Sequence, residues 1–178
     1  MKEKEAIVVN IFGGPGTGKS ILAAELFARL KKEFISCDIS HEYIKTKLRE
    51  KALKATESQI YIFGKQQFQL FCLKDEVDVI ITDSPILFCT IYDKTECPYL
   101  RDLILKEYDK YNNLNTYLNR DLTVLYEQEG RYQDLNGAKL VDTKIYDFLI
   151  KQQIPIKEYY NILEDTITDI IKNIKEKL

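Results

Sequence analysis

A glycine-rich segment near the N-terminus has the residue types and the spacing of a phosphate-binding loop. Residues 13–20 read GGPGTGKS and match the pattern G-x-x-x-x-G-K-[ST]. Glycine tolerates positive φ angles, so several backbone N–H groups can converge on one anion, and a following helix adds the positive end of its dipole. The pattern predicts that Lys19 contacts the β- and γ-phosphates of a nucleoside triphosphate and that the Ser20 hydroxyl binds Mg²⁺. The residues expected around ATP are Gly13, Gly14, Pro15, Gly16, Thr17, Gly18, Lys19, Ser20 and Ile21.

Three carboxylates follow segments that have the composition of strands. Asp83 comes directly after the apolar run 77–82, and Asp38 and Glu42 follow an expected strand at 34–37. The carboxyl ends of parallel strands meet at the ligand-binding edge of a sheet, so these acids are expected beside the phosphate loop. We predict that Asp83 holds Mg²⁺ and that Glu42, or as second candidate Asp38, accepts the proton of a substrate hydroxyl. The alternative for Glu42 is a solvated helix start.

The late part of the chain contains two arginines around a polar segment, whereas lysine predominates elsewhere. Arg120 and Arg131 accompany the stretch 121–133. A polar segment that carries arginines can close over phosphates and neutralise charge during transfer, so we predict a lid at about 120–133. Exposed surface arginines are the alternative. Gln66 interrupts an apolar helical pattern, and it is predicted either to contact a base or sugar of the substrate or to satisfy a buried backbone group.

The elements that must hold these residues alternate between apolar runs and longer helical patterns, which is typical of an α/β domain with a parallel sheet. Strands are predicted at 6–12, 34–37, 77–82, 114–118 and 154–159. Helices are predicted at 20–32, 41–54, 57–73, 99–111, 137–152 and 161–178. The stripe of the third helix that is expected to face the core consists of Ile60, Phe63, Gln67, Leu70 and Phe71.

The overall composition is that of an ordinary globular protein. The chain has 178 residues, 45% of them hydrophobic and 30% charged, with a net charge of −2. These values exclude a disordered chain and predict one domain over residues 1–178. No apolar run approaches the ~20 residues of a membrane helix, and the N-terminus lacks the features of a signal peptide, so we expect a cytoplasmic protein. Nucleic acid is not an expected partner because there is no basic excess, and the four cysteines lack zinc-site spacing.

Six short blocks, taken in order, resemble a family of small P-loop proteins classed as AAA, many of which come from bacteriophages. The blocks are IFGGPGTGKS, HEYIK, QIYIFGKQ, VDVIITDSP, NLNTYLNR and GRYQ, and the resemblance extends over most of the chain, roughly from Ile7 to Tyr159. This family is similar to ribosylnicotinamide kinase domains and, more loosely, to thymidylate and deoxynucleoside kinases. The resemblance implies a three-layer P-loop NTPase fold, in which helices flank a five-stranded parallel sheet of order 2-3-1-4-5. It implies the same phosphate, metal, acceptor and lid roles for Lys19, Ser20, Asp83, Glu42, Arg120 and Arg131.

The motifs and the resemblance together predict a P-loop kinase that transfers the γ-phosphoryl group of ATP to a nucleoside or a nucleotide-like small molecule. An ATPase or GTPase switch that acts through a protein or nucleic-acid partner is the alternative from another class, and a kinase of polynucleotide ends is the third. The chain leaves little room for the helical subdomain of AAA motors and lacks the N-K-x-D block of GTPases. We expect a monomer or homodimer without membrane association, in the host cytoplasm if a phage encodes it.

Overall fold

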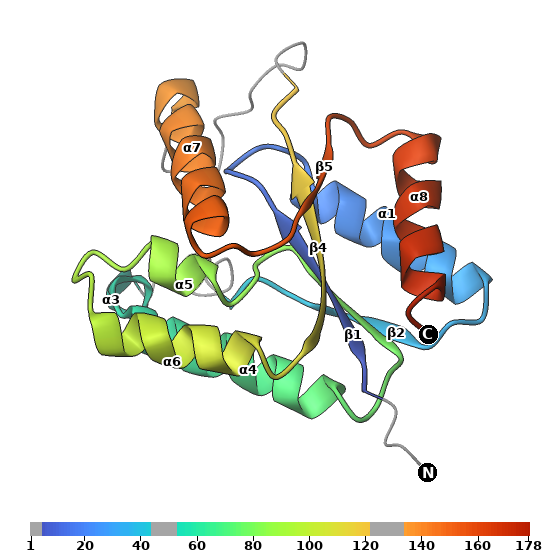
Figure 1. Ribbon diagram of the computed structural model, residues 1–178, viewed down its shortest axis with the longest axis horizontal. Coiled ribbons are helices and arrows are strands. Elements are labelled where there is room, and N and C mark those ends of the chain that lie inside the picture. The colour runs from blue at the N-terminus through green and yellow to red at the C-terminus, as the bar shows by residue number, and fades with distance from the viewer. Residues whose placement is uncertain (1–4, 44–52, 122–133) are drawn as a thin grey trace.

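A parallel sheet of five strands in the order β2-β3-β1-β4-β5 forms the centre of the molecule (Figure 1). The computed structural model describes residues 5–43, 53–121 and 134–178. The strands are β1 (Ile7–Phe12), β2 (Cys37–Ser40), β3 (Val79–Thr82), β4 (Asn112–Leu118) and β5 (Lys157–Tyr159). The strand order is the one that the resemblance implied, so the predicted P-loop fold is confirmed.

Helices cover both faces of this sheet, as Figure 1 shows. They are α1 (Lys19–Lys32), α3 (Leu53–Glu57), α4 (Gln59–Leu73), α5 (Phe88–Ile91), α6 (Pro98–Tyr108), α7 (Leu135–Lys151) and α8 (Glu164–Lys175). Alternate residues of β1 divide between two cores. Ile7, Val9 and Ile11 pack with α1 and α8, whereas Val8 and Phe12 pack with α4, α5, α6 and α7. Both faces of β1 are therefore buried, which is why its sequence is almost entirely apolar.

The second strand lies three residues later than predicted, at Cys37–Ser40 instead of 34–37. The backbone N–H groups of residues 34 and 35 donate to carbonyls in the last turn of α1, in the pattern of a Schellman C-cap. Phe34 takes the left-handed position of this cap, with a φ of 60°, and is 98% exposed. The prediction was wrong because Phe34 ends the helix instead of starting the strand. As a consequence, Asp38 lies inside β2, and Glu42 comes two residues after its end.

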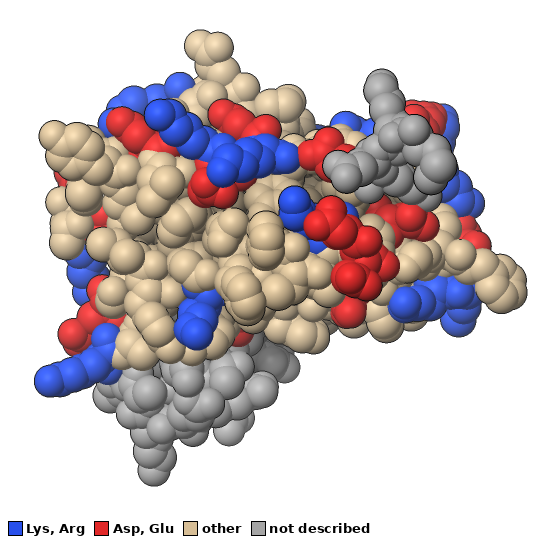
Figure 2. All heavy atoms as spheres, turned by 90° about the horizontal axis from the view of Figure 1, so that it is seen from below, with Lys and Arg blue, Asp and Glu red and all other residues tan. Residues whose placement is uncertain are grey.

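Helix α4 buries a different face from the predicted stripe. Its buried residues are Gln59, Ile62, Phe63, Gln66 and Leu70. Ile60 and Phe71, which were expected in the core, are 67% and 53% exposed. Phe63 and Leu70 belong to both sets, and the mean direction of the buried face differs from that of the predicted stripe by roughly 75°. Figure 2 shows a broad area without charged side chains on the side of the molecule where α4 and α6 lie.

Most other elements begin and end within three residues of their predicted bounds. The short helix α5 was not predicted. The predicted helix at 41–54 lies mostly outside the described residues, and α3 starts only at its end. None of the helices described has the length and apolar character needed to cross a membrane.

A buried asparagine joins β1 to β4. The Asn10 side-chain amide donates to Oδ1 of Asn113 at 2.8 Å and to Oδ1 of Asn115 at 3.1 Å. The Tyr108 hydroxyl donates to the same Asn115 oxygen at 2.8 Å. Asn10 and Asn115 are also partners in the strand register. The network therefore satisfies a polar group in the middle of the sheet and favours this register over its neighbours.

We predict that Asn10→Val lowers the free energy of unfolding by about 1–3 kcal/mol, because Asn113 and Asn115 lose their common donor. Chemical denaturation measures this change. The control is Asn136→Val at an exposed position of α7, where the effect should stay within about 0.5 kcal/mol. Equal effects at the two positions would show that the network does not stabilise the sheet.

Candidate functional site

The phosphate-loop residues lie between the end of β1 and the start of α1. Gly13, Gly16 and Gly18 have φ angles of 139°, 80° and 95°, a region that residues with a Cβ atom rarely adopt. Gly18 is the N-cap of α1, and no side chain in the described part of the chain caps this helix end. The first N–H groups of α1 and the positive end of its dipole therefore lie next to the loop.

The carbonyl of Gly14 is the common acceptor within the loop. Lys19 Nζ donates to this oxygen at 2.7 Å, and Thr17 donates to it through its hydroxyl at 3.1 Å and its N–H at 3.4 Å. The Lys19 ammonium also lies 5.9 Å from the centre of the Phe88 ring. Lys19 thus lies across the loop, with its charge beside the predicted phosphate position.

Helix α7 contacts the loop from outside. A Cβ atom at Gly14 would lie 2.0 Å from Asp142 Oδ1 and 3.2 Å from the carbonyl oxygen of Ala138. Arg120, just after β4, pairs with Asp142 through Nε and Nη2 at 2.7 and 3.0 Å. Its Nη2 also donates to the carbonyl of Pro15 at 2.7 Å. Sequence reasoning missed Asp142, because one acid in an amphipathic helix forms no recognisable motif.

Asp83 is buried beside the loop. The last residue of β3, Thr82, pairs with Asn10 of β1, so Asp83 leaves the sheet just before the level of Gly13. Its side chain is only 6% exposed. Ser20 lies in the first turn of α1 and is exposed.

These two oxygen donors fit the expected Mg²⁺, which usually takes one or two protein oxygens and completes its shell with phosphates and water. Among the described residues, no group of three or more His, Cys, Asp or Glu side chains could hold a metal ion by itself.

The two candidate bases differ in their surroundings. Burial raises the pKa of Tyr92 to about 12, and the negative charges of Glu42 and Asp142 add to the rise. Glu42 is therefore within electrostatic range of the same hydroxyl as Asp142, which lies against the loop. Asp38 is exposed within β2, and its carboxylate accepts the N–H of Ile39 at 2.7 Å. Which of the two acids lies on the acceptor side stays a prediction.

The amide of Gln66 is engaged inside the protein. Its Nε2 donates to Oγ of Ser84 at 2.7 Å and to the Ser84 carbonyl at 3.3 Å. The Cys89 thiol donates to Gln66 Oε1 at 3.2 Å. Of the two predicted roles, this geometry matches the satisfaction of a buried backbone group, and contact with a base or sugar stays a prediction.

Other predicted residues lie at the margin of the site or outside the described residues. Ile21 is in the first turn of α1 with its side chain largely exposed. Arg131 and the lid residues 122–133 lie outside the described residues. Of the predicted lid, the structure describes Arg120 and Asp121.

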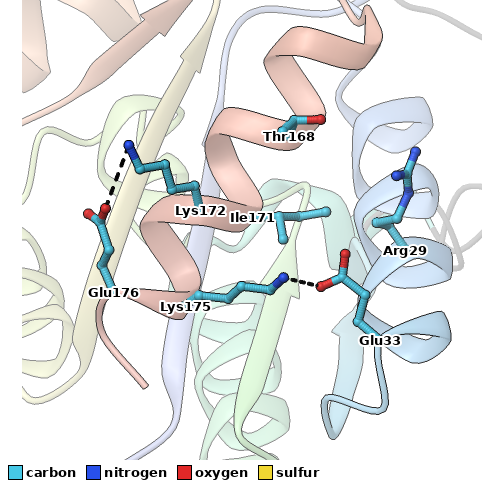
Figure 3. A pocket seen from close by; sticks show the side chains of 7 residues that line it. All are labelled: Arg29, Glu33, Thr168, Ile171, Lys172, Lys175 and Glu176. Carbon is cyan, nitrogen blue, oxygen red and sulfur yellow. Dashed lines mark ion pairs between the residues drawn. The ribbon is translucent and has the colours of Figure 1, made fainter.

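A groove of about 470 Å³ lies between α1 and α8 (Figure 3). It is lined by Arg29, Glu33, Thr168, Ile171, Lys172, Lys175 and Glu176. Within it Lys175 pairs with Glu33 at 2.6 Å. Arg29 and Glu33 belong to the C-terminal end of α1, whereas the phosphate loop precedes its N-terminal end. The groove is therefore separate from the phosphate loop.

The chain matches a known family over most of its length. A family model described as an AAA domain matches residues 8–161, and the protein belongs to this AAA domain family. No curated protein matches the chain.

Solved structures show the same fold. Deoxyadenosine kinase from M. mycoides with bound dATP has a TM-score of 0.56 and 20% identity, over 96% of this chain and 98% of that chain. Deoxyadenosine kinase from M. mycoides with the products dCMP and a flexible dCDP has a TM-score of 0.57 and 18% identity, over 96% and 100% of the two chains. APE1195 has a TM-score of 0.52 and 16% identity, over 98% and 96%. The protein therefore has the P-loop fold that these solved structures share.

We predict that Gly14→Ala weakens binding of Mg²⁺-ATP at least about tenfold, because the new methyl group displaces the Asp142 carboxylate from its ion pair with Arg120 beside the loop. Calorimetric titration measures the Kd. Gly64→Ala is the matched control, since an added Cβ there meets nothing within 4 Å. The control should stabilise α4 by about 0.5–1 kcal/mol and leave the Kd unchanged. An unchanged Kd for Gly14→Ala would show that the loop tolerates displacement of Asp142.

Proposed function

We propose that the protein is a kinase that transfers the γ-phosphoryl group of ATP to a nucleoside or a nucleotide-like small molecule. The observation that carries this proposal is the glycine-rich loop, in which Lys19 lies across the loop and buried Asp83 lies beside it. Such a loop at a helix N-terminus is suited to the phosphates of a nucleoside triphosphate. Phosphoryl transfer depends mainly on positioning and electrostatic stabilisation, which these groups can supply.

The proposed roles follow from the placement of each group. Lys19 and the loop N–H groups hold the β- and γ-phosphates. Ser20 and Asp83 are the proposed ligands of Mg²⁺, which neutralises phosphate charge when it is bound. Glu42 orients or deprotonates the acceptor hydroxyl. With a monophosphate as acceptor no base is needed, and Glu42 then binds the sugar.

The fold supports a nucleoside-type acceptor. The solved structures of similar fold include deoxyadenosine kinases, which act on small nucleoside substrates by their name. The AAA domain family as described is broader and does not select an acceptor. The lid at about 120–133, with Arg131 as a charge-neutralising residue, remains part of the proposal for the transfer step.

We predict that a panel of possible acceptors will take up label from ATP that carries a radioactive γ-phosphate. The panel contains nucleosides, deoxynucleosides, nucleotides, nicotinamide riboside and DNA ends, and chromatography identifies the labelled product. Lys19→Ala should reduce the transfer at least about 10²-fold, because a charge that stabilises the transferring group is lost. Label found only in inorganic phosphate would contradict the kinase and favour a switch that hydrolyses ATP. Label at DNA ends would favour a polynucleotide kinase.

We predict that Glu42→Gln lowers kcat for transfer to a hydroxyl by about 10²–10⁴-fold, because the proton acceptor is lost while the side-chain shape is kept. The KM for ATP should change little. Asp38→Asn is measured in parallel, and a larger loss there would move the role of the base to Asp38. Glu25→Gln, at an exposed position of α1, is the control and should leave the rate unchanged.

A further inference from the structure

We propose that Arg120 and Asp142 are a positioning pair for the phosphate loop, in which Arg120 acts through Asp142 and Pro15 instead of on the transferred phosphoryl group. This inference rests on the proposed function, since it gives the pair a role in binding the triphosphate. It assigns a role to Asp142, which no motif indicates. It also gives Arg120 a role other than that of a lid residue.

The guanidinium of Arg120 connects α7 to the loop. It forms a two-point ion pair with Asp142, with distances of 2.7 and 3.0 Å, and it donates to the Pro15 carbonyl at 2.7 Å. A bidentate pair between arginine and a carboxylate fixes the orientation of both groups. Nη2 donates both to Asp142 Oδ1 and to the Pro15 carbonyl. A movement of the loop along α7 would therefore break one of these two hydrogen bonds.

Asp142 sets the spacing between α7 and the loop. Its Oδ1 lies 2.0 Å from the point where a Cβ atom of Gly14 would be, so carboxylate and loop backbone are in contact. The Tyr117 hydroxyl donates to the backbone carbonyl of Asp142 at 3.0 Å, which ties the helix to β4 at the same residue. Asp142 is therefore held through both its side chain and its backbone.

The charges of the pair give a test that separates positioning from direct catalysis. The side chains of Arg120 and Asp142 are 8% and 19% exposed, so solvent screens their charges only weakly. Without Arg120, the Asp142 carboxylate would stay unpaired next to the loop and repel an anionic ligand. Removal of Arg120 alone should therefore weaken the binding of ATP more than removal of both charges does.

The experiment is a double-mutant cycle of Arg120→Ala and Asp142→Asn, read as the Kd of Mg²⁺-ATP by calorimetry. Arg120→Ala should weaken binding at least about tenfold, because it leaves a buried carboxylate unpaired. Asp142→Asn should weaken it less, and the double variant should bind at least about fivefold more tightly than Arg120→Ala. In the transfer assay, KM for ATP should rise more than kcat falls.

Two further measurements keep the result interpretable. Thermal unfolding shows whether each variant is folded. If Arg120→Ala does not fold, Arg120→Lys replaces it in the cycle, alone and together with Asp142→Asn. Lysine keeps the charge but cannot make both contacts, so an intermediate Kd is expected. The exposed pair Arg29–Glu164 on α1 and α8 is the matched control. Its cycle should show no coupling and no change in Kd.

The outcomes distinguish the pair from the proposed function. A fall in kcat in Arg120→Ala that Asp142→Asn does not relieve would overturn the positioning role and favour contact between Arg120 and the transferred group. Additive losses in affinity would overturn it as well. If the unaltered protein binds ATP but labels no acceptor, the kinase proposal fails, whereas rescue of the Kd by Asp142→Asn still supports the pair.

Discussion

Close packing against three other elements holds the phosphate loop in shape. A Cβ atom at Gly13 would lie 2.6 Å from the Leu118 carbonyl at the end of β4, and one at Gly18 would lie 2.6 Å from Ile162 after β5. At Gly14 the space for a Cβ atom is filled by Asp142 and by the carbonyl of Ala138, both in α7. Gly13 therefore has no space for a Cβ atom, because a backbone carbonyl fills it, and Gly13 and Gly18 also have the positive φ that glycine favours. At Gly14 and Gly18 a Cβ atom would displace the side chains of Asp142 and Ile162.

The central position of β1 in the sheet brings Asp83 and Arg120 to the same edge as the loop. Its neighbours are β3 on one side and β4 on the other, and all three strands are parallel. Their carboxyl ends consequently lie at the same edge, with Asp83 after β3 and Arg120 after β4. A buried acid and a largely buried cation thus flank the loop from opposite sides. The acid suits a metal ion, and the cation is already paired with Asp142.

Lys19 and Arg120, both cations near the loop, are held in different ways. Lys19 donates to the carbonyl of Gly14, a neutral acceptor that anionic phosphates can replace. Arg120 makes a two-point, largely buried pair with a carboxylate, and charge-assisted bonds of this kind are about twice as strong as neutral ones. The ion pair of Arg120 with Asp142 is therefore stronger than the hydrogen bond from Lys19 to Gly14.

The sequence alone determined the phosphate loop, the α/β class and the approximate bounds of most elements, because glycine spacing and apolar periodicity are properties of neighbouring residues. It also indicated that Asp83 lies on the side of the loop, because a residue that follows a buried parallel strand comes at the carboxyl edge of the sheet. Only the tertiary structure decided the start of β2, the buried face of α4 and the pairing of Arg120 with Asp142, 22 residues apart. These features depend on which distant residues fill the same space, and local patterns do not contain that information.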